Sequence, residues 1–282
     1  MCVCISRILI LLFMCTFRNI GLFLLLSLVV TATEAQKRTY NKLVWQDDFS
    51  VSGLPDSTKW GYDIGTGCPR ICGWGNNEAQ YYTNARKENA RVENGHLIIE
   101  ARKEKFEGSN YTSARLVTKN KGDWKYGRMV IRAKIPTGKG LWPAGWILPT
   151  GKVYGEWPKS GEVDILEAVG FAPDSAFGSV HTERYNGMIG TQRTASLIVP
   201  NLSTQFHDYE IEWTPEKIDF YIDNKLYNSF KNEHTGSAAW PFDQTFHLIF
   251  NIAVGGNLGG KFGIDDVIFP AQMRVDWVKV FQ

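Results

Sequence analysis

The chain has little net charge and few cysteines, and each shortage excludes a class of protein. Its 31 Lys and Arg against 29 Asp and Glu leave a net charge of +2, and without a dense basic face nothing indicates a nucleic-acid-binding protein. The five cysteines stand outside any zinc-finger spacing. The chain also lacks a P-loop ending in Gly-Lys-Ser/Thr, a Gly-x-Ser-x-Gly elbow and a His-Glu-x-x-His motif, which are signatures of nucleotide binding, serine hydrolysis and zinc proteolysis.

Aromatic residues and glycine are abundant instead. The 282 residues include 10 Trp, 11 Tyr and 16 Phe beside 27 Gly. Hydrophobic residues make up 44% and charged residues 21%, which is ordinary globular usage and excludes wholesale disorder. Tryptophan at this density indicates either a large all-β core or a groove in which indole rings stack on sugars.

The N-terminal residues are mostly apolar but are interrupted at Arg18. The later apolar run, residues 20–30, is followed by the small-x-small pattern Thr33-Glu34-Ala35, which is typical of a cleaved signal peptide. The alternative is an uncleaved anchor, but a bilayer span needs about 20 uninterrupted apolar residues. We therefore expect residues 1–35 to be a signal peptide and the protein to be secreted, extracellular and free of the membrane after cleavage.

Residues 36–282 are expected to form one β-rich domain. Short runs in which apolar residues alternate with polar ones recur along it, and Gly, Asn or Asp stands in the gaps. No long stretch keeps a helical period. The pair Asp223-Asn224 between two such runs predicts a hairpin turn. The clearest runs are residues 96–101, 127–133, 207–213, 217–223, 246–251 and 273–280. This pattern predicts an all-β sandwich or barrel.

Only Cys68 and Cys72 remain once the signal peptide is removed. In a secreted protein a pair this close indicates a loop disulfide, because a metal site would need further Cys or His nearby. Two glycosylation sequons, at Asn110 and Asn201, would be used only in the secretory path.

The most informative segment is the acidic run from Gly161 to Gly170. In a regular strand Glu162 and Asp164 share one face, whereas Glu167 points to the other. A one-residue bulge after Asp164 would bring Glu167 back beside the other two acids. A solvated strand face is the alternative, but the apolar residues between the acids indicate a strand inside a sheet, where clustered acids are costly unless they are used.

The segment Gly140-Leu141-Trp142-Pro143-Ala144-Gly145-Trp146 lies just upstream of the acids. The indoles of Trp142 and Trp146 could stack on sugar rings. They could equally be core aromatics.

Together these motifs resemble glycoside hydrolase family 16. The likeness rests on the Glu-x-Asp-x-x-Glu strand, the Gly-Leu-Trp-Pro-Ala segment and residues 73–78, Gly-Trp-Gly-Asn-Asn-Glu. It extends from residues 45–49 through 94–97 to 275–277 and is strongest with laminarinase-type endo-1,3-β-glucanases, since the licheninase branch typically lacks the extra residue in the acidic strand. The resemblance implies a jelly-roll β-sandwich of two antiparallel sheets with a concave substrate cleft, and retaining hydrolysis of laminarin-type β-glucans.

By this resemblance Glu162 is the nucleophile, Glu167 the general acid/base, and Asp164 holds and polarises the nucleophile. Retention requires two carboxyl groups about 5–5.5 Å apart. Three crowded acids do not all ionise easily, so one pKa rises and that group can donate a proton. No cofactor is required for this chemistry.

The resemblance also implies substrate-binding residues. His181 is expected to reach the cleft, or else to be a strand histidine satisfied by a neighbour. Leu258 and Gly145 stand where aromatic residues are frequent, which bears on subsite affinity. Residues that could bind sugar hydroxyls, or merely tie down loops, are Asn76, Arg115 and Asn251.

A structural calcium ion is the family's usual accessory, on the side away from the cleft. The matching ligands would be Asp48, the carbonyl of Gly95 and Asp276. Asp48 could instead be an ordinary turn acid.

The expected partner is a β-1,3-glucan polysaccharide or oligosaccharide, bound by a monomer. A glucan-recognition protein without hydrolysis is one alternative, against which the retained acids argue. A hydrolase of mixed-linkage glucan or galactan is another, because those enzymes share the same carboxylate chemistry. A calcium-dependent lectin has only the sandwich pattern in its favour.

Overall fold

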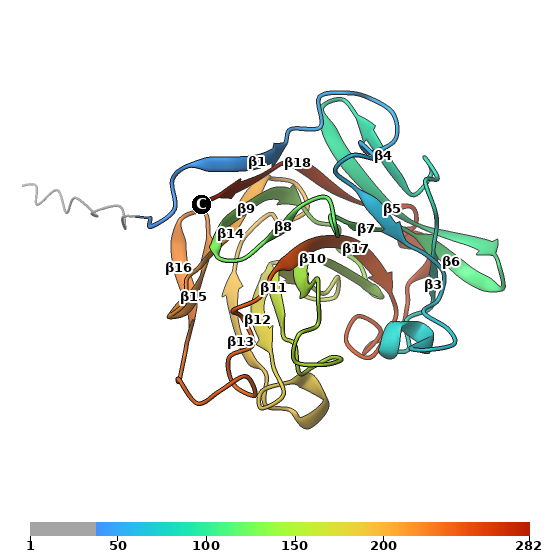
Figure 1. Ribbon diagram of the computed structural model, residues 1–282. Helices are drawn as coiled ribbons and strands as arrows, with labels where there is room; N and C mark the ends of the chain where they lie inside the picture. The colour runs from blue at the N-terminus through green and yellow to red at the C-terminus, as the bar shows by residue number, and fades with distance from the viewer. Residues whose placement is uncertain (1–37) are drawn as a thin grey trace, which may run out of the picture. The chain divides into compact units, whose positions relative to one another are not determined.

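The computed structural model describes residues 38–282, which form two β-sheets packed face to face (Figure 1). The predicted signal peptide, residues 1–35, lies outside the described residues. The helical segments among the described residues are three short 3-10 turns, η1 (Cys72–Gly75), η2 (Gly187–Ile189) and η3 (Asp266–Ile268). The prediction of an all-β fold is therefore confirmed. Between residues 38 and 282 no helix has the length and apolar character needed to cross a bilayer.

The larger sheet has ten strands in the order β16-β15-β14-β9-β18-β5-β6-β3, with β1 paired to β18 and β4 paired to β5. Neighbours are antiparallel except for β3 and β6. Its strands are β1 (Leu43–Asp47), β3 (Gln80–Tyr82), β4 (Ala90–Glu93), β5 (His96–Phe106), β6 (Ser109–Ser113), β9 (Gly127–Lys134), β14 (His207–Trp213), β15 (Lys217–Ile222), β16 (Lys225–Lys231) and β18 (Ala271–Phe281).

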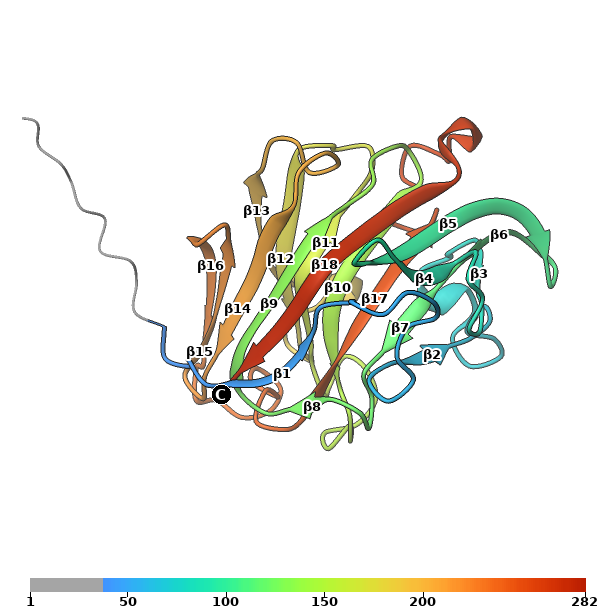
Figure 2. The same ribbon diagram turned by 90° about the horizontal axis from the view of Figure 1, so that it is seen from above.

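The smaller sheet has eight strands in the order β13-β12-β11-β10-β17-β7-β2, with β8 paired to β17. Figure 2 shows the strands of the larger sheet crossing in front of those of the smaller one. The smaller sheet contains β2 (Gly61–Asp63), β7 (Arg115–Val117), β8 (Asp123–Trp124), β10 (Leu141–Pro149), β11 (Glu162–Ala168), β12 (Ser175–His181), β13 (Arg193–Ile198) and β17 (Phe246–Val254).

Alternation along each strand produces the core between the sheets. The inward side chains of both sheets are fully or almost fully buried, and they include Leu97, Ile131, Ile211, Val163, Leu248 and Phe250. Two of the tryptophans, Trp60 and Trp213, lie in this core at 1% exposure. The high tryptophan content therefore serves the core in part, and other indoles lie on the outer face of the smaller sheet.

The predicted strand runs and hairpin are confirmed. The six alternating runs correspond to β5, β9, β14, β15, β17 and β18. Asp223 and Asn224 connect β15 to β16 with φ values of 49° and 65°, and Ile222 pairs with Lys225 across them. Positive φ at both central positions is the geometry of a two-residue hairpin turn.

Candidate active site

Strand β11 carries the three predicted acids, in the middle of the smaller sheet. Asp164 pairs with Ser179 and Glu167 pairs with Phe177 of β12. Between these two pairs β11 contains two residues and β12 contains one, so β11 has one extra residue. This is the predicted one-residue bulge. The two residues inside it are fully buried, whereas Glu162 and Glu167 keep partial exposure. The bulge therefore places both glutamates on the outer face of the sheet, with Asp164 between them.

The three acids change one another's protonation. Burial and the charge of Asp164 raise the pKa of Glu162 to about 8 and that of Glu167 to about 7. A carboxyl group whose pKa lies near neutrality is suited to general acid catalysis. The cluster thus retains a proton at a pH where an ordinary glutamate has lost it.

One hydrogen bond orients Glu167. Nε1 of Trp142, on β10, donates to Oε1 of Glu167 at 2.8 Å. The hydroxyl of Ser179, which accepts a bond from Oγ1 of Thr194 at 2.9 Å, has a smaller effect on the Glu167 carboxyl. Both groups favour the carboxylate and lower the pKa of Glu167 against the effect of burial. Trp142 is therefore a partner of the acid cluster and not a core aromatic.

His181 lies opposite Glu162 on the neighbouring strand β12. Its Nε2 lies 3.4 Å from Oδ2 of Asp164 and 3.8 Å from Oε1 of Glu162. Its Nδ1 accepts the backbone N–H of Gly187 at 3.2 Å. Burial lowers the pKa of His181, but the hydrogen bond to Asp164 and the surrounding carboxyl groups outweigh burial and raise that pKa to about 9. His181 therefore faces the three acids, as expected of a cleft histidine. It also has a hydrogen-bond partner in the neighbouring turn, as expected of a structural histidine.

A chain of hydrogen bonds fixes Trp146 on the other side of the acids. Nε1 of Trp146 donates to Oδ1 of Asn251 at 2.7 Å, and Nδ2 of Asn251 donates to the hydroxyl of Tyr82 at 3.0 Å. That hydroxyl donates in turn to Glu78 at 3.3 Å, a carboxyl whose pKa burial raises. Because both amide atoms of Asn251 are engaged within the protein, this residue acts first by holding the indole in place.

Arg115 stacks between two indoles. Its guanidinium carbon lies 4.6 Å from the ring centroid of Trp74 and 4.7 Å from that of Trp146, within the range of cation–π attraction. Nε of Arg115 lies 3.0 Å from Oδ2 of Asp63. Both rings remain partly exposed, so the stack presents aromatic surface beside the acids.

The remaining candidates on this side are loop residues. The carbonyl of Asn76 accepts the backbone N–H of Asn257 at 2.7 Å, so Asn76 ties two loops together while its side chain stays partly exposed. Leu258 is 37% exposed in the second of these loops. For Gly145 the expectation of a subsite position is wrong, because a Cβ there would lie 2.8 Å from Phe250 and 3.0 Å from Ile131. A larger side chain at Gly145 would enter the core.

A disulfide joins Cys68 and Cys72, as predicted, with 4.1 Å between their Cα atoms. The chain then continues directly into η1, which contains Trp74. Nε1 of Trp74 donates to the carbonyl of Gly65 at 3.1 Å. The bond therefore restrains the segment that holds Trp74 against Arg115.

The predicted calcium ligands lie along neighbouring strands of the larger sheet. Asp276 belongs to β18, Asp48 follows β1 on one side of it, and Gly95 precedes β5 on the other. The carboxylate of Asp276 lies 3.2 Å from Nε of Arg132 and 3.3 Å from Nδ1 of His96. In this arrangement nitrogen atoms already face Asp276, and three oxygen donors are fewer than the six to eight that Ca²⁺ takes. The residues as placed do not form a calcium cage, and the site stays a prediction.

The acids also offer ligand atoms that a metal could use, since donor atoms of Glu162, Asp164 and His181 lie within 4.8 Å of one another. The bulge places Glu162 and Glu167 on one face, and the bond from Trp142 orients Glu167 there.

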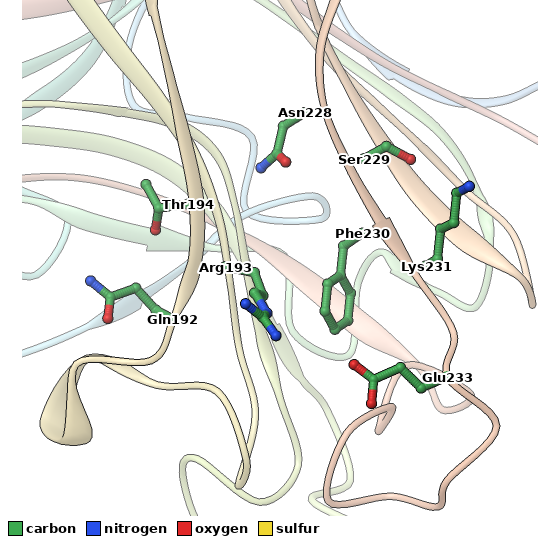
Figure 3. Close-up of a pocket in the computed structure, with 8 residues that line it drawn as sticks. All are labelled: Gln192, Arg193, Thr194, Asn228, Ser229, Phe230, Lys231 and Glu233. Carbon is green, nitrogen blue, oxygen red and sulfur yellow. The ribbon is translucent and has the colours of Figure 1, made fainter.

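A separate pocket of about 450 Å³ lies where the edge strands β13 and β16 of the two sheets meet (Figure 3). Its lining is Gln192, Arg193, Thr194, Asn228, Ser229, Phe230, Lys231 and Glu233. The Arg193 guanidinium stacks 4.1 Å from the centroid of Tyr185, whose hydroxyl bonds Glu233. None of the three acids lines this pocket.

Sequence reasoning missed several neighbours of the acids. Trp157 is 40% exposed, and its ring centroid lies 6.0 Å from that of His181. It belongs to a loop without strand periodicity, so no pattern indicated where it lies. Tyr82 and Glu78 come from the opposite end of the domain sequence and meet Asn251 only through the fold.

Comparison with known proteins agrees with this geometry. Residues 77–279 match the family described as glycosyl hydrolases family 16. A beta-glucanase of Rhodothermus marinus is 55% identical over 255 residues, which cover 88% of this chain and 87% of that protein.

Solved structures are similar over nearly the same span. The X-ray structure of the laminarinase from Rhodothermus marinus has a TM-score of 0.83 and 54% identity, and covers 87% of this chain and 99% of that one. A mutant of a non-specific endo-β-1,3(4)-glucanase of family 16 has a TM-score of 0.82 and 41% identity, and covers 87% of this chain and 97% of its own. That mutant presents 1,3-β-D-cellobiosyl-glucose at its active site.

Proposed function

The chain belongs to glycosyl hydrolases family 16, and from this premise we propose that it is an endo-β-1,3-glucanase that hydrolyses laminarin-type β-glucans with retention. The observation that supports this most directly is the bulge in β11, which turns Glu162 and Glu167 to one face. Two carboxyl groups about 5–5.5 Å apart suit direct attack on the sugar, whereas inversion needs a wider gap for water.

In the first step Glu167 protonates the glycosidic oxygen and the carboxylate of Glu162 attacks the anomeric carbon. The bond from that carbon to the leaving oxygen breaks, and an ester bond to Glu162 forms. In the second step Glu167, now a carboxylate, takes a proton from water, and the water oxygen displaces Glu162. Each step inverts the anomeric carbon once, so the β configuration is restored.

The first step requires the shared proton on Glu167 and a carboxylate on Glu162. Nε2 of His181 lies 3.8 Å from Glu162, and an N–H there favours the carboxylate form of Glu162. When Glu162 becomes a neutral ester, its repulsion on Glu167 falls and the pKa of Glu167 falls with it. Glu167 then works as a base at the same pH at which it worked as an acid.

Asp164 acts between the two glutamates. It is 6% exposed, and His181 approaches one of its oxygens at 3.4 Å. Its charge raises the pKa of both glutamates. We assign to Asp164 the positioning and polarisation of Glu162.

The glucan is proposed to lie across the outer face of the smaller sheet. On one side of the acids it meets the partly exposed rings of Trp142 and Trp146, with Arg115 behind the latter. Stacking on aromatic faces suits sugar rings, which present apolar C–H surfaces. His181 and the exposed ring of Trp157 stand on the other side of the acids.

Secretion and the extent of the catalytic domain remain part of the proposal. Residues 1–35 are proposed to be removed, and residues 36–282 to act alone. The disulfide between Cys68 and Cys72 supports an oxidising compartment, because such bonds persist mainly outside the cytosol. N-terminal sequencing of protein from the culture medium should begin at residue 36.

Digestion of four polymers side by side tests the activity and its specificity. Laminarin should yield internal oligosaccharides of several lengths, with slower release from lichenan and little from agarose or carrageenan. Glu167→Gln should lose this activity, and the matched control Glu107→Gln, at an exposed turn position, should keep it. Glucan binding without products would favour the recognition protein, and products only from agarose or carrageenan would favour a galactanase.

A further inference from the structure

The two ring nitrogens of His181 have different kinds of partner. Nε2 faces Asp164 and Glu162, which offer oxygen acceptors. Nδ1 faces the backbone N–H of Gly187 at 3.2 Å, and an amide N–H only donates. Nδ1 must therefore present its lone pair, and the ring's single proton sits on Nε2.

The turn that supplies this N–H is held by a buried asparagine. Asn186 caps η2 and is 4% exposed. Its Oδ1 accepts the backbone N–H of Met188 at 3.1 Å, and its Nδ2 donates to two backbone carbonyls at 3.0 and 3.1 Å. The apolar side chain of Met188 is 79% exposed. The turn is therefore fixed by the bonds of Asn186 and not by burial of Met188.

We propose that η2 is a tautomer clamp, in which the Gly187 amide, positioned by Asn186, keeps His181 a neutral imidazole with its proton on Nε2. Asn186 is thus a positioning residue for the reaction, acting through His181. The inference rests on the proposed roles of the acids and names a residue that those roles alone do not require.

The charges around His181 show why a clamp is needed. Glu162, Asp164 and Glu167 of β11 all favour the imidazolium, and against the effect of burial they raise the pKa of His181 to about 9, a balance in which the Gly187 N–H is not counted. The charged residues of the turn are engaged elsewhere, since Arg184 pairs with Glu233 and Glu183 lies 3.7 Å from Lys159. The loop that carries Trp157 presents an uncharged ring to the histidine. Opposing the carboxyl groups are burial and the Gly187 N–H, because protonation of Nδ1 would set two donors against each other.

A neutral His181 matters for the general acid. A positive charge on this ring lowers the pKa of Glu167. An imidazolium would therefore favour the deprotonated form of Glu167, which cannot donate a proton to the glycosidic oxygen. With the ring neutral, the Nε2–H still orients Asp164, and the pKa of Glu167 stays high. The clamp thereby keeps the acid protonated at neutral pH.

NMR of protein with ¹⁵N-labelled histidine tests the tautomer without any activity measurement. Near neutral pH, His181 should show an unprotonated Nδ1 and a protonated Nε2, with scalar coupling between Nδ1 and the Gly187 amide. A His181→Gln spectrum assigns the signals among the five histidines of the chain. An imidazolium at that pH, or a proton on Nδ1 alone, would overturn the proposal.

A pair of variants tests the effect on the reaction. Asn186→Ala should release the Gly187 N–H, let His181 take a second proton, and move the basic limb of kcat/KM to lower pH. A move of about 1 pH unit is a tenfold loss on that limb, and kcat should fall more than KM rises. Met188→Ala, in the same turn but exposed, should leave the profile unchanged.

The outcomes separate this inference from the proposed function. If Asn186→Ala loses activity equally at every pH, and the basic limb of its kcat/KM profile stays at the wild-type pH, Asn186 has a purely structural role and the clamp is refuted. If the wild-type protein hydrolyses no glucan, the proposed function fails, whereas the NMR spectrum still decides the tautomer.

Discussion

Replacing Trp142 with phenylalanine removes one hydrogen bond from Glu167, the proposed general acid, and keeps an aromatic ring on β10. In the native protein Nε1 of Trp142 donates to Oε1 of Glu167 at 2.8 Å. This bond favours the carboxylate, while burial and Asp164 raise the pKa of Glu167 to about 7. Loss of the bond should raise that pKa further.

The size of the shift follows from the strength of the bond. A hydrogen bond to a charged group contributes about 1.5–3 kcal/mol, and one pKa unit corresponds to about 1.36 kcal/mol. Because the Ser179 hydroxyl continues to favour the carboxylate of Glu167, the lower end applies, and the pKa should rise by about 1 unit. Glu167 must be protonated to act as the acid, so the basic limb of kcat/KM should move to higher pH by the same amount.

The assay is the pH profile of kcat/KM on laminarin for wild type, Trp142→Phe and Trp146→Phe. Trp146→Phe is the matched control, because it loses a bond to Asn251 at 2.7 Å and leaves the bond from Trp142 to Glu167 in place. An unmoved limb in folded Trp142→Phe, or a move to lower pH, would refute the reasoning.

Three further predictions concern the nucleophile, the disulfide and the calcium site. Glu162→Gln should abolish turnover while preserving the fold and glucan binding, because an amide cannot form the glycosyl ester; near wild-type turnover would remove Glu162 from that role. Joint replacement of Cys68 and Cys72 by serine should speed amide exchange near Trp74 with little change in Tm, because so short a loop removes little chain entropy, and two free thiols in unreduced peptides of secreted protein would disprove the bond. If calcium binds at Asp276, EGTA should lower Tm and Asp276→Asn should abolish that effect; identical melts with and without calcium would speak against the site.

Much of the fold follows from alternation in the sequence, and so does the central feature of the site. In a regularly alternating strand Glu167 would point to the face opposite Glu162, into the core. Burying a carboxyl group in the core is costly, so the sequence predicts an extra residue in the strand that returns Glu167 to the face of Glu162. The structure places that residue between Asp164 and Glu167. Alternation also explains the error at Gly145, since outward-facing Trp142 and Trp146 leave Gly145 facing inward.

The supporting contacts could not be predicted in this way, because they join residues far apart in the chain. Tyr82 reaches Asn251 across 169 residues of sequence, and no periodic pattern marks such a pairing. The bond from Gly187 to His181 is local, but it depends on the path of an irregular turn. Trp157 meets His181 through a loop whose course only tertiary packing defines.

Proton NMR of the first sugar released from laminarin tests the central claim, that Glu162 and Glu167 on one bulged strand perform a double displacement. Direct attack by Glu162 followed by hydrolysis of the ester restores the starting configuration. The β-anomer should therefore appear first, with the α-anomer growing only as mutarotation proceeds. If the α-anomer appears first, the two-carboxylate assignment is contradicted, even if the protein cleaves β-1,3-glucan.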